Sequence, residues 1–74
     1  MQLADYLKLP YHRIIRPDES GYWSARVLEL DGVLSEGETV AEAAENLNVA
    51  MGLWIDHELA QGHAIPTPVG THSG

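Results

Sequence analysis

Cysteine is absent from this chain of 74 residues, and long apolar runs are absent as well. Without cysteine the protein has neither a disulfide framework nor a thiolate zinc site, which argues against a secreted mini-protein and for a cytoplasmic location. No stretch approaches the roughly 20 apolar residues that cross a bilayer, and the start, MQLADYLKL, lacks the charged-then-apolar pattern of a signal peptide. We therefore expect a soluble protein without membrane contact.

The chain is also too short for a large core. It makes one domain, which buries only about 60% of the surface that its unfolded form exposes. A sheet of short strands leaves edges uncovered as well. We therefore expect a homo-oligomer, either a dimer or a tetramer.

Positive charge is scarce and confined to the start of the chain. All the basic residues precede residue 27: Lys8, Arg13, Arg16 and Arg26. Residues 27–74 carry eight acidic residues and no lysine or arginine, and the net charge of the whole chain is −7. Such a field repels phosphate and favours a basic partner, so we expect no direct nucleic-acid binding by this domain. Acidity that serves solubility alone is the alternative interpretation.

Motifs for catalysis and metal binding are lacking too. The chain has no Gly-rich phosphate loop, no paired histidines on one helical face, no cysteine nucleophile and no nucleophile-elbow sequence. Its four histidines are scattered over a predicted strand, a helix end and the tail: His12, His57, His63 and His72. We therefore expect no enzyme activity, no catalytic residue, no metal and no cofactor.

A hairpin is predicted in the first half of the chain. Residues 11–16 mix aromatic and β-branched side chains and run into the turn cluster Pro-Asp-Glu-Ser-Gly of residues 17–21. The next run alternates, with one face formed by Trp23, Ala25 and Val27 and the other by Ser24 and Arg26. These two segments predict an antiparallel pair of strands.

A third strand and a short N-terminal helix are also predicted. Asp31-Gly32 is a second turn signal, and residues 33–36 predict a short third strand that ends before Gly37. Apolar residues spaced through residues 3–7 and followed by Pro10 predict a short N-terminal helix. The sheet is therefore predicted to be antiparallel and three-stranded.

One long helix is predicted after the sheet. Thr39 and Glu42 have capping-box spacing, in which the hydroxyl accepts from a free amide and the carboxylate reaches back to the cap residue. An apolar stripe follows at helical spacing: Val40, Ala43, Ala44, Leu47, Met51, Trp54 and Ile55. Gly62 is the stop signal. The fold class is therefore α+β, a β-β-β-α arrangement with one long helix packed on the sheet.

The opposite face of this helix carries the candidate binding residues. At about 100° per residue, five side chains cluster within roughly 80°: Glu42, Glu45, Val49, Leu53 and Asp56. Two aliphatic side chains among carboxylates have the apolar centre and charged rim of an interface, although single exposed aliphatics are common. Glu36 and Glu38 lie at the helix entrance, where the helix dipole also favours negative charge. We predict that these seven residues bind a partner.

The end of the chain predicts a tail. The segment AIPTPVGTHSG contains two prolines and two glycines and ends in small polar residues. We expect a single domain over residues 1–66 and a flexible tail over residues 67–74, with a short C-terminal strand as the alternative.

Two segments together carry a family resemblance. Residues 21–47 read GYWSARVLELDGVLSEGETVAEAAENL, with Gly-Glu-Thr-x-x-Glu-Ala at their centre, and residues 62–68 end in Pro-x-Pro. In combination they resemble the HicB-like antitoxin family. Leu28 stands where the family pattern usually has proline, and Val33 where it often has cysteine.

This resemblance implies both a fold and a function. The fold would be a β-β-β-α core like a truncated ribonuclease H domain. The function would be that of an antitoxin, which neutralises a small basic HicA-like toxin that cleaves messenger RNA. Carboxylates can cover such a basic surface at phosphate positions, so no catalysis is needed. Many family members add a DNA-binding domain, which these residues lack, so operator binding is not expected of them.

Two other functions fit the sequence less well. A degenerate ribonuclease H-like nuclease would need carboxylates converging on a divalent metal from the first strand and the helix. Residues 11–16 contain none, and Asp18 lies in the predicted turn. A small oligomeric ligand-binding or structural protein is the other alternative, because the second face of the sheet has no assigned role.

Overall fold

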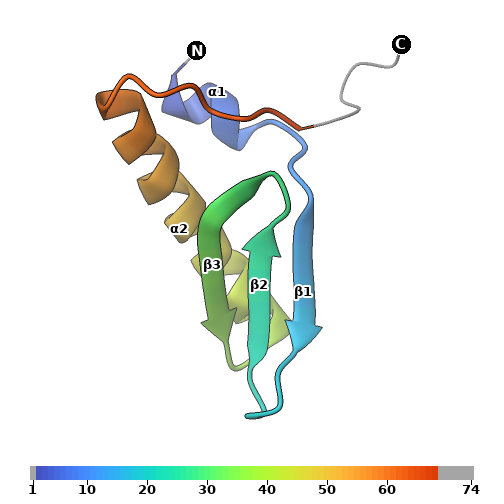
Figure 1. Ribbon diagram of the computed structural model, residues 1–74. Helices are drawn as coiled ribbons and strands as arrows, with labels where there is room; N and C mark the ends of the chain where they lie inside the picture. Colours follow the sequence, from blue (N-terminus) through green and yellow to red (C-terminus); the bar gives the residue numbers. More distant parts are fainter. Residues whose placement is uncertain (1, 69–74) are drawn as a thin grey trace.

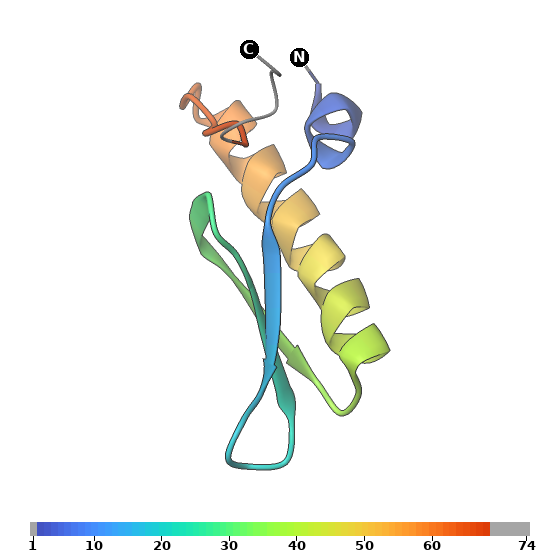
Figure 2. The ribbon, with the colours of Figure 1, turned by 90° about the vertical axis from the view of Figure 1, so that its right-hand side faces the viewer.

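The computed structural model describes residues 2–68 and has two layers, a sheet and a long helix (Figures 1 and 2). The elements follow the chain in the order α1 (Leu3–Leu7), β1 (Arg13–Pro17), β2 (Trp23–Val27), β3 (Leu30–Gly37) and α2 (Val40–Ala60). The predicted α+β class, with a β-β-β-α core and a short N-terminal helix, is confirmed. None of the helices within residues 2–68 is long and apolar enough to span a membrane.

The sheet is antiparallel, in the spatial order β1-β2-β3, and α2 covers one of its faces. Successive side chains of a strand point to opposite faces. The predicted alternation of β2 is confirmed, since Ala25 and Val27 are buried under α2 whereas Arg26 is exposed on the other side. Figure 1 looks onto the face that α2 leaves uncovered, and Figure 2 shows the two layers from the side.

The turn between β2 and β3 differs from the prediction. It is formed by Leu28 and Glu29, and β3 already begins at Leu30, so the prediction of a turn at Asp31-Gly32 is wrong. Val27 of β2 pairs with Leu30, but the adjacent β2 residue, Arg26, pairs with Leu34. Residues 31–33 of β3 therefore have no partner in β2 and form a bulge.

The bulge has a physical reason in the packing of β3 on α2. Leu30 and Val33, at the start of β3, are both almost fully buried. Gly32 lies against the indole of Trp54. The contact is so close that a Cβ added at Gly32 would lie 2.6 Å from the Trp54 Nε1 atom. Gly32 is therefore needed for a close contact with the helix and not for a hairpin turn.

The core lies between the sheet and one side of α2. The fully buried residues of α2 form what we call the inner stripe: Ala43, Leu47, Met51 and Ile55. Burying each of the larger side chains contributes about 1.5–3 kcal/mol. Val40 was expected in this stripe but is 45% exposed. Val40 is the first residue of α2, and the helix first meets β3 nearly a turn later, where Ala43 lies beside Gly37.

Side chains and backbone bonds define both ends of α2. The Thr39 hydroxyl accepts a hydrogen bond from the Glu42 amide at 3.0 Å, as predicted. The Glu42 carboxylate accepts from the Glu38 amide at 2.9 Å and not from that of Thr39, so this half of the capping box differs. The stop at Gly62 is confirmed: Gly62 has φ +74°, and the His63 amide donates to the Glu58 carbonyl at 2.9 Å, as in a Schellman motif.

The segment after α2 returns across the domain. The Tyr11 hydroxyl donates to the Pro66 carbonyl at 2.6 Å, and Ile65 and Pro68 are buried. Residues 63–68 form no strand, so the alternative of a C-terminal strand is not realised in them. Residues 69–74, which make up most of the predicted tail, lie outside the described residues.

Candidate partner-binding surface

The outer side of α2 presents one exposed row of apolar and acidic side chains. The inner stripe turns toward the sheet, so residues half a turn away must face solvent. We call this row the acidic α2 face: Glu42, Glu45, Val49, Leu53 and Asp56. All five residues are exposed, and Leu53 and Val49 are exposed to 69% and 60%. The structure therefore brings together these five of the seven predicted binding residues.

The carboxylates of the acidic α2 face differ in their bonding. Glu42 accepts the Glu38 amide and so helps to cap α2. Among residues 2–68, no hydrogen bond or ion pair involves the carboxylate of Glu45 or Asp56. Both groups are therefore open to a cation of a partner.

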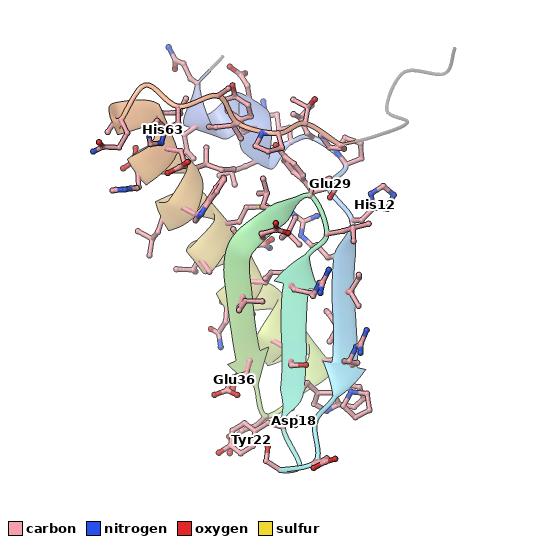
Figure 3. The ribbon with its side chains drawn as sticks, viewed as in Figure 1. His12, Asp18, Tyr22, Glu29, Glu36 and His63 are labelled. Carbon is pink, nitrogen blue, oxygen red and sulfur yellow. The ribbon has the colours of Figure 1, made fainter. Side chains whose placement is uncertain are left out.

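The other two predicted binding residues lie apart from one another. Glu38 is exposed in the link between β3 and α2, next to Glu42. Glu36 lies near the end of β3 (Figure 3). Its neighbour Ser35 points toward α2 and donates to the Ala43 carbonyl at 3.0 Å, so the side chain of Glu36 lies on the opposite face of the sheet. The structure does not bring Glu36 together with the acidic α2 face.

A second exposed surface was not predicted from the sequence. We call it the free sheet face, and it contains the strand residues that point away from α2: Ile14, Arg16, Ser24, Arg26, Leu34 and Glu36. A shallow hollow of about 370 Å³ lies on it, lined in part by Arg16, Arg26 and Leu34. The alternation of β2 had already separated Ser24 and Arg26 from the core. Only the register of β1 and β3 shows which residues lie beside them.

A family model for UPF0150-like proteins matches residues 1–66. The chain belongs to the UPF0150-like family. No curated protein and no solved structure matches it.

Carboxylates and histidines of this UPF0150-like chain meet in pairs. His12 bonds to Glu29 near the turn between β2 and β3, and the His63 Nδ1 atom lies 3.3 Å from the Glu58 Oε1 atom at the end of α2 (Figure 3). Within residues 2–68, no three histidine, aspartate or glutamate side chains are grouped so that they could hold a metal ion.

The pair of His12 and Glu29 changes the acidity of the carboxyl group. Burial by itself would raise the pKa of Glu29. The His12 ring and the His12 amide, at 3.0 Å, both bond to the carboxylate, and together these bonds lower the pKa of Glu29 below its ordinary value. Burial raises the pKa of Tyr11, with smaller contributions from Tyr6 and Glu29. Both shifts arise at the edge of the core and not on the acidic α2 face.

Asp18, the acid that a nuclease would need near the first strand, has a local role. Its carboxylate accepts from the Glu19 amide at 2.7 Å and from the Ser20 hydroxyl at 3.1 Å. These bonds close the hairpin loop at the tip of the sheet, at the opposite end from Glu29 (Figure 3). Asp18 therefore shapes a turn, as such residues commonly do.

Proposed function

We propose that this protein is a HicB-like antitoxin that binds a small basic HicA-like toxin and covers its RNA-cleaving surface. The acidic α2 face is the binding surface, and the antitoxin contributes no catalytic group. One observation carries the proposal: Val49 and Leu53, the two most exposed large apolar side chains of α2, lie between Glu45 and Asp56, whose carboxylates have no bonding partner within residues 2–68.

The chemistry of this face supports a basic protein partner. Val49 and Leu53 can be buried against apolar atoms, each with a gain of about 1.5–3 kcal/mol before the costs of association. Glu45 and Asp56 flank them and would meet lysine or arginine side chains. Opposite charges across an interface speed encounter and select the partner more than they raise affinity.

The charge of the whole chain supports the same partner. The net charge of −7 attracts a basic protein at long range and repels RNA and DNA. A toxin that cleaves RNA must itself be basic where it holds phosphates. Carboxylates on a rigid helix can occupy those positions without being cleaved.

Family membership supports the proposal as well. The UPF0150-like family is a family of small proteins of the HicB-like, antitoxin type. The Gly-Glu-Thr-x-x-Glu-Ala segment that resembles HicB-like antitoxins forms the end of β3 and the first turn of α2, where the acidic α2 face begins.

The proposal predicts that the adjacent reading frame encodes a small basic protein, and the test uses that protein. Affinity is measured by titration calorimetry, and inhibition of its RNA cleavage is measured in parallel. We expect Glu45→Lys/Asp56→Lys to weaken binding about tenfold or more and to reduce inhibition, because two attractive charges become repulsive. Association of this variant should also be slower and less sensitive to salt than that of the wild type.

A matched control has the same change in charge elsewhere. Glu19→Lys/Asp31→Lys alters two exposed acids on the hairpin loop and the β3 bulge, neither of which uses its side chain in a hydrogen bond within residues 2–68. This control should bind almost as the wild type does. Equal affinity of wild type and Glu45→Lys/Asp56→Lys would remove the acidic α2 face from the interface, and failure of the wild type to bind would refute the proposed function.

A further inference from the structure

The free sheet face is uncovered and carries two arginines and one glutamate on a chain whose net charge is −7. Arg26 lies on the middle strand, with Ile14 of β1 and Leu34 of β3 as its cross-strand neighbours. Arg16 and Ser24 are paired in the next row, which Glu36 completes. Within residues 2–68, no hydrogen bond or ion pair involves the guanidinium of Arg16 or Arg26, whereas Arg13 donates to Asn48 at 3.2 Å.

The acidic α2 face has the complementary pattern. It places Val49 and Leu53 between carboxylates, and the free sheet face places Ile14 and Leu34 beside guanidinium groups. Among the large apolar side chains of residues 2–68, the three most exposed are Leu53 at 69%, Leu34 at 66% and Val49 at 60%. All three belong to these two faces.

We propose that the free sheet face of one copy binds the acidic α2 face of a second copy. Arg16 and Arg26 would meet Glu45 and Asp56, and Leu34 would be buried against Val49 and Leu53. This contact covers exposed apolar surface on both copies and gives each arginine an anionic partner. Planar guanidinium groups are well suited to such pairs with carboxylates.

Charge argues against the two symmetric alternatives. If two free sheet faces stacked about a twofold axis, four guanidinium groups, from Arg16 and Arg26 of both copies, would meet only the two Glu36 carboxylates of these faces. If two acidic α2 faces packed together, carboxylates would oppose carboxylates. Like charges across an interface are unfavourable, so the contact between unlike faces has the better charge complementarity.

The two faces lie on opposite sides of the two-layer domain (Figure 2). A contact between unlike faces therefore leaves each end of a pair able to bind another copy, which produces a stack or a closed ring. If the proposed function also holds, a basic toxin and a second copy compete for the acidic α2 face. The self-association itself does not depend on the proposed function, because it involves this chain alone.

A charge-swap experiment tests the contact. Variant one, Arg16→Glu/Arg26→Glu, changes the free sheet face, and variant two, Glu45→Arg/Asp56→Arg, changes the acidic α2 face. Sedimentation velocity gives the weight-average mass as a function of protein concentration. We expect the wild-type mass to rise with concentration and each variant alone to associate about tenfold more weakly or not at all.

The mixture of the two variants is the decisive sample. Each variant keeps one native face, and the altered faces carry opposite charges, so both kinds of contact become complementary again. An equimolar mixture should therefore regain association. A mixture that stays monomeric, or variant two associating as the wild type does, would overturn the proposal, and the latter result would indicate stacking of sheet on sheet.

Further variants control for the change in net charge and for a loss of folding. Glu19→Arg/Asp31→Arg has the same charge as variant two but leaves both faces intact, so it should associate like the wild type. If a charge variant fails to fold by circular dichroism, Leu34→Ser and Leu53→Ser replace exposed residues on the two faces, and each should weaken association. A wild type that is monomeric at all concentrations refutes this inference and leaves toxin binding to be judged by its own assay.

Discussion

The two sides of α2 bear the same kinds of apolar residue in opposite environments. Leu47 on the inner stripe is fully buried, whereas Leu53, less than two turns later on the acidic α2 face, is 69% exposed. Leu47 contacts the sheet and stabilises the fold, and Leu53 has no such contact to lose. Hydrophobicity alone therefore does not distinguish a residue of the core from a residue available to a partner.

Replacing Leu47 and Leu53 by alanine tests whether only the inner stripe of α2 stabilises the fold. Leu47→Ala should lower the free energy of unfolding by about 2–5 kcal/mol, because it removes buried methyl groups and leaves a cavity. Leu53→Ala should change it by no more than about 0.5 kcal/mol. Urea unfolding of both variants at the same low protein concentration gives the two values. Similar losses would mean that the outer side of α2 is also covered.

Two glycines, one packed against α2 and one within α2, show the same contrast between close and open packing. A Cβ at Gly37 would lie 2.5 Å from the Ala43 amide nitrogen, so Gly37→Ala should destabilise the protein by about 1–3 kcal/mol. At Gly52, in α2, a Cβ would meet nothing within 4 Å, so Gly52→Ala should stabilise by about 0.5–1 kcal/mol through the higher helix propensity of alanine. Thermal unfolding followed by circular dichroism measures both. The same sign for both changes would contradict the difference in packing.

The dependence of stability on acid separates the core, which has no buried charged group within residues 2–68, from the hydrogen-bonded Glu29 carboxylate at its edge. The pKa of Glu29 is lower in the folded state than the ordinary value of 4.5, so the unfolded state binds more protons near that pH. The contribution of Glu29 is therefore present above about pH 4.5 and is lost as the pH falls through the folded pKa. Glu29→Gln should lower stability at neutral pH and flatten its decline in acid.

Urea unfolding at a series of pH values measures this effect. The difference between wild type and Glu29→Gln should shrink as the pH falls below 4.5. Glu19→Gln removes an exposed carboxylate from the hairpin loop and is the matched control. Parallel curves for wild type and Glu29→Gln would show that the bonds from His12 do not stabilise the carboxylate.

Local patterns predicted the elements that depend on local interactions. Thr39 and Gly62 mark the two ends of α2 because a cap hydroxyl and a glycine at positive φ act on backbone within one turn. The alternation in residues 23–27 predicted which face of β2 is buried, since a half-buried strand has a period of two residues.

The same patterns failed where a distant segment decides the outcome. Asp31-Gly32 has the composition of a turn, but the indole of Trp54 needs the space that Gly32 leaves. Glu36 is close to the helix entrance in the chain, yet the pairing with Ser24 places it on the far face of the sheet. Neither the contact of Gly32 with Trp54 nor the strand register can be inferred from the residues that surround these positions in the chain.

The amino-acid pattern alone predicted that this chain folds as a β-β-β-α domain and that one side of α2 combines carboxylates with exposed aliphatic residues. Periodicity and caps are properties of short segments, so they can be recognised without knowing which other segments pack against them. That Arg16, Arg26 and Leu34 share one uncovered face, opposite the acidic α2 face, follows from the folded structure and not from the pattern. These residues come from three different strands, and their meeting depends on a register that the packing of β3 on α2 selects.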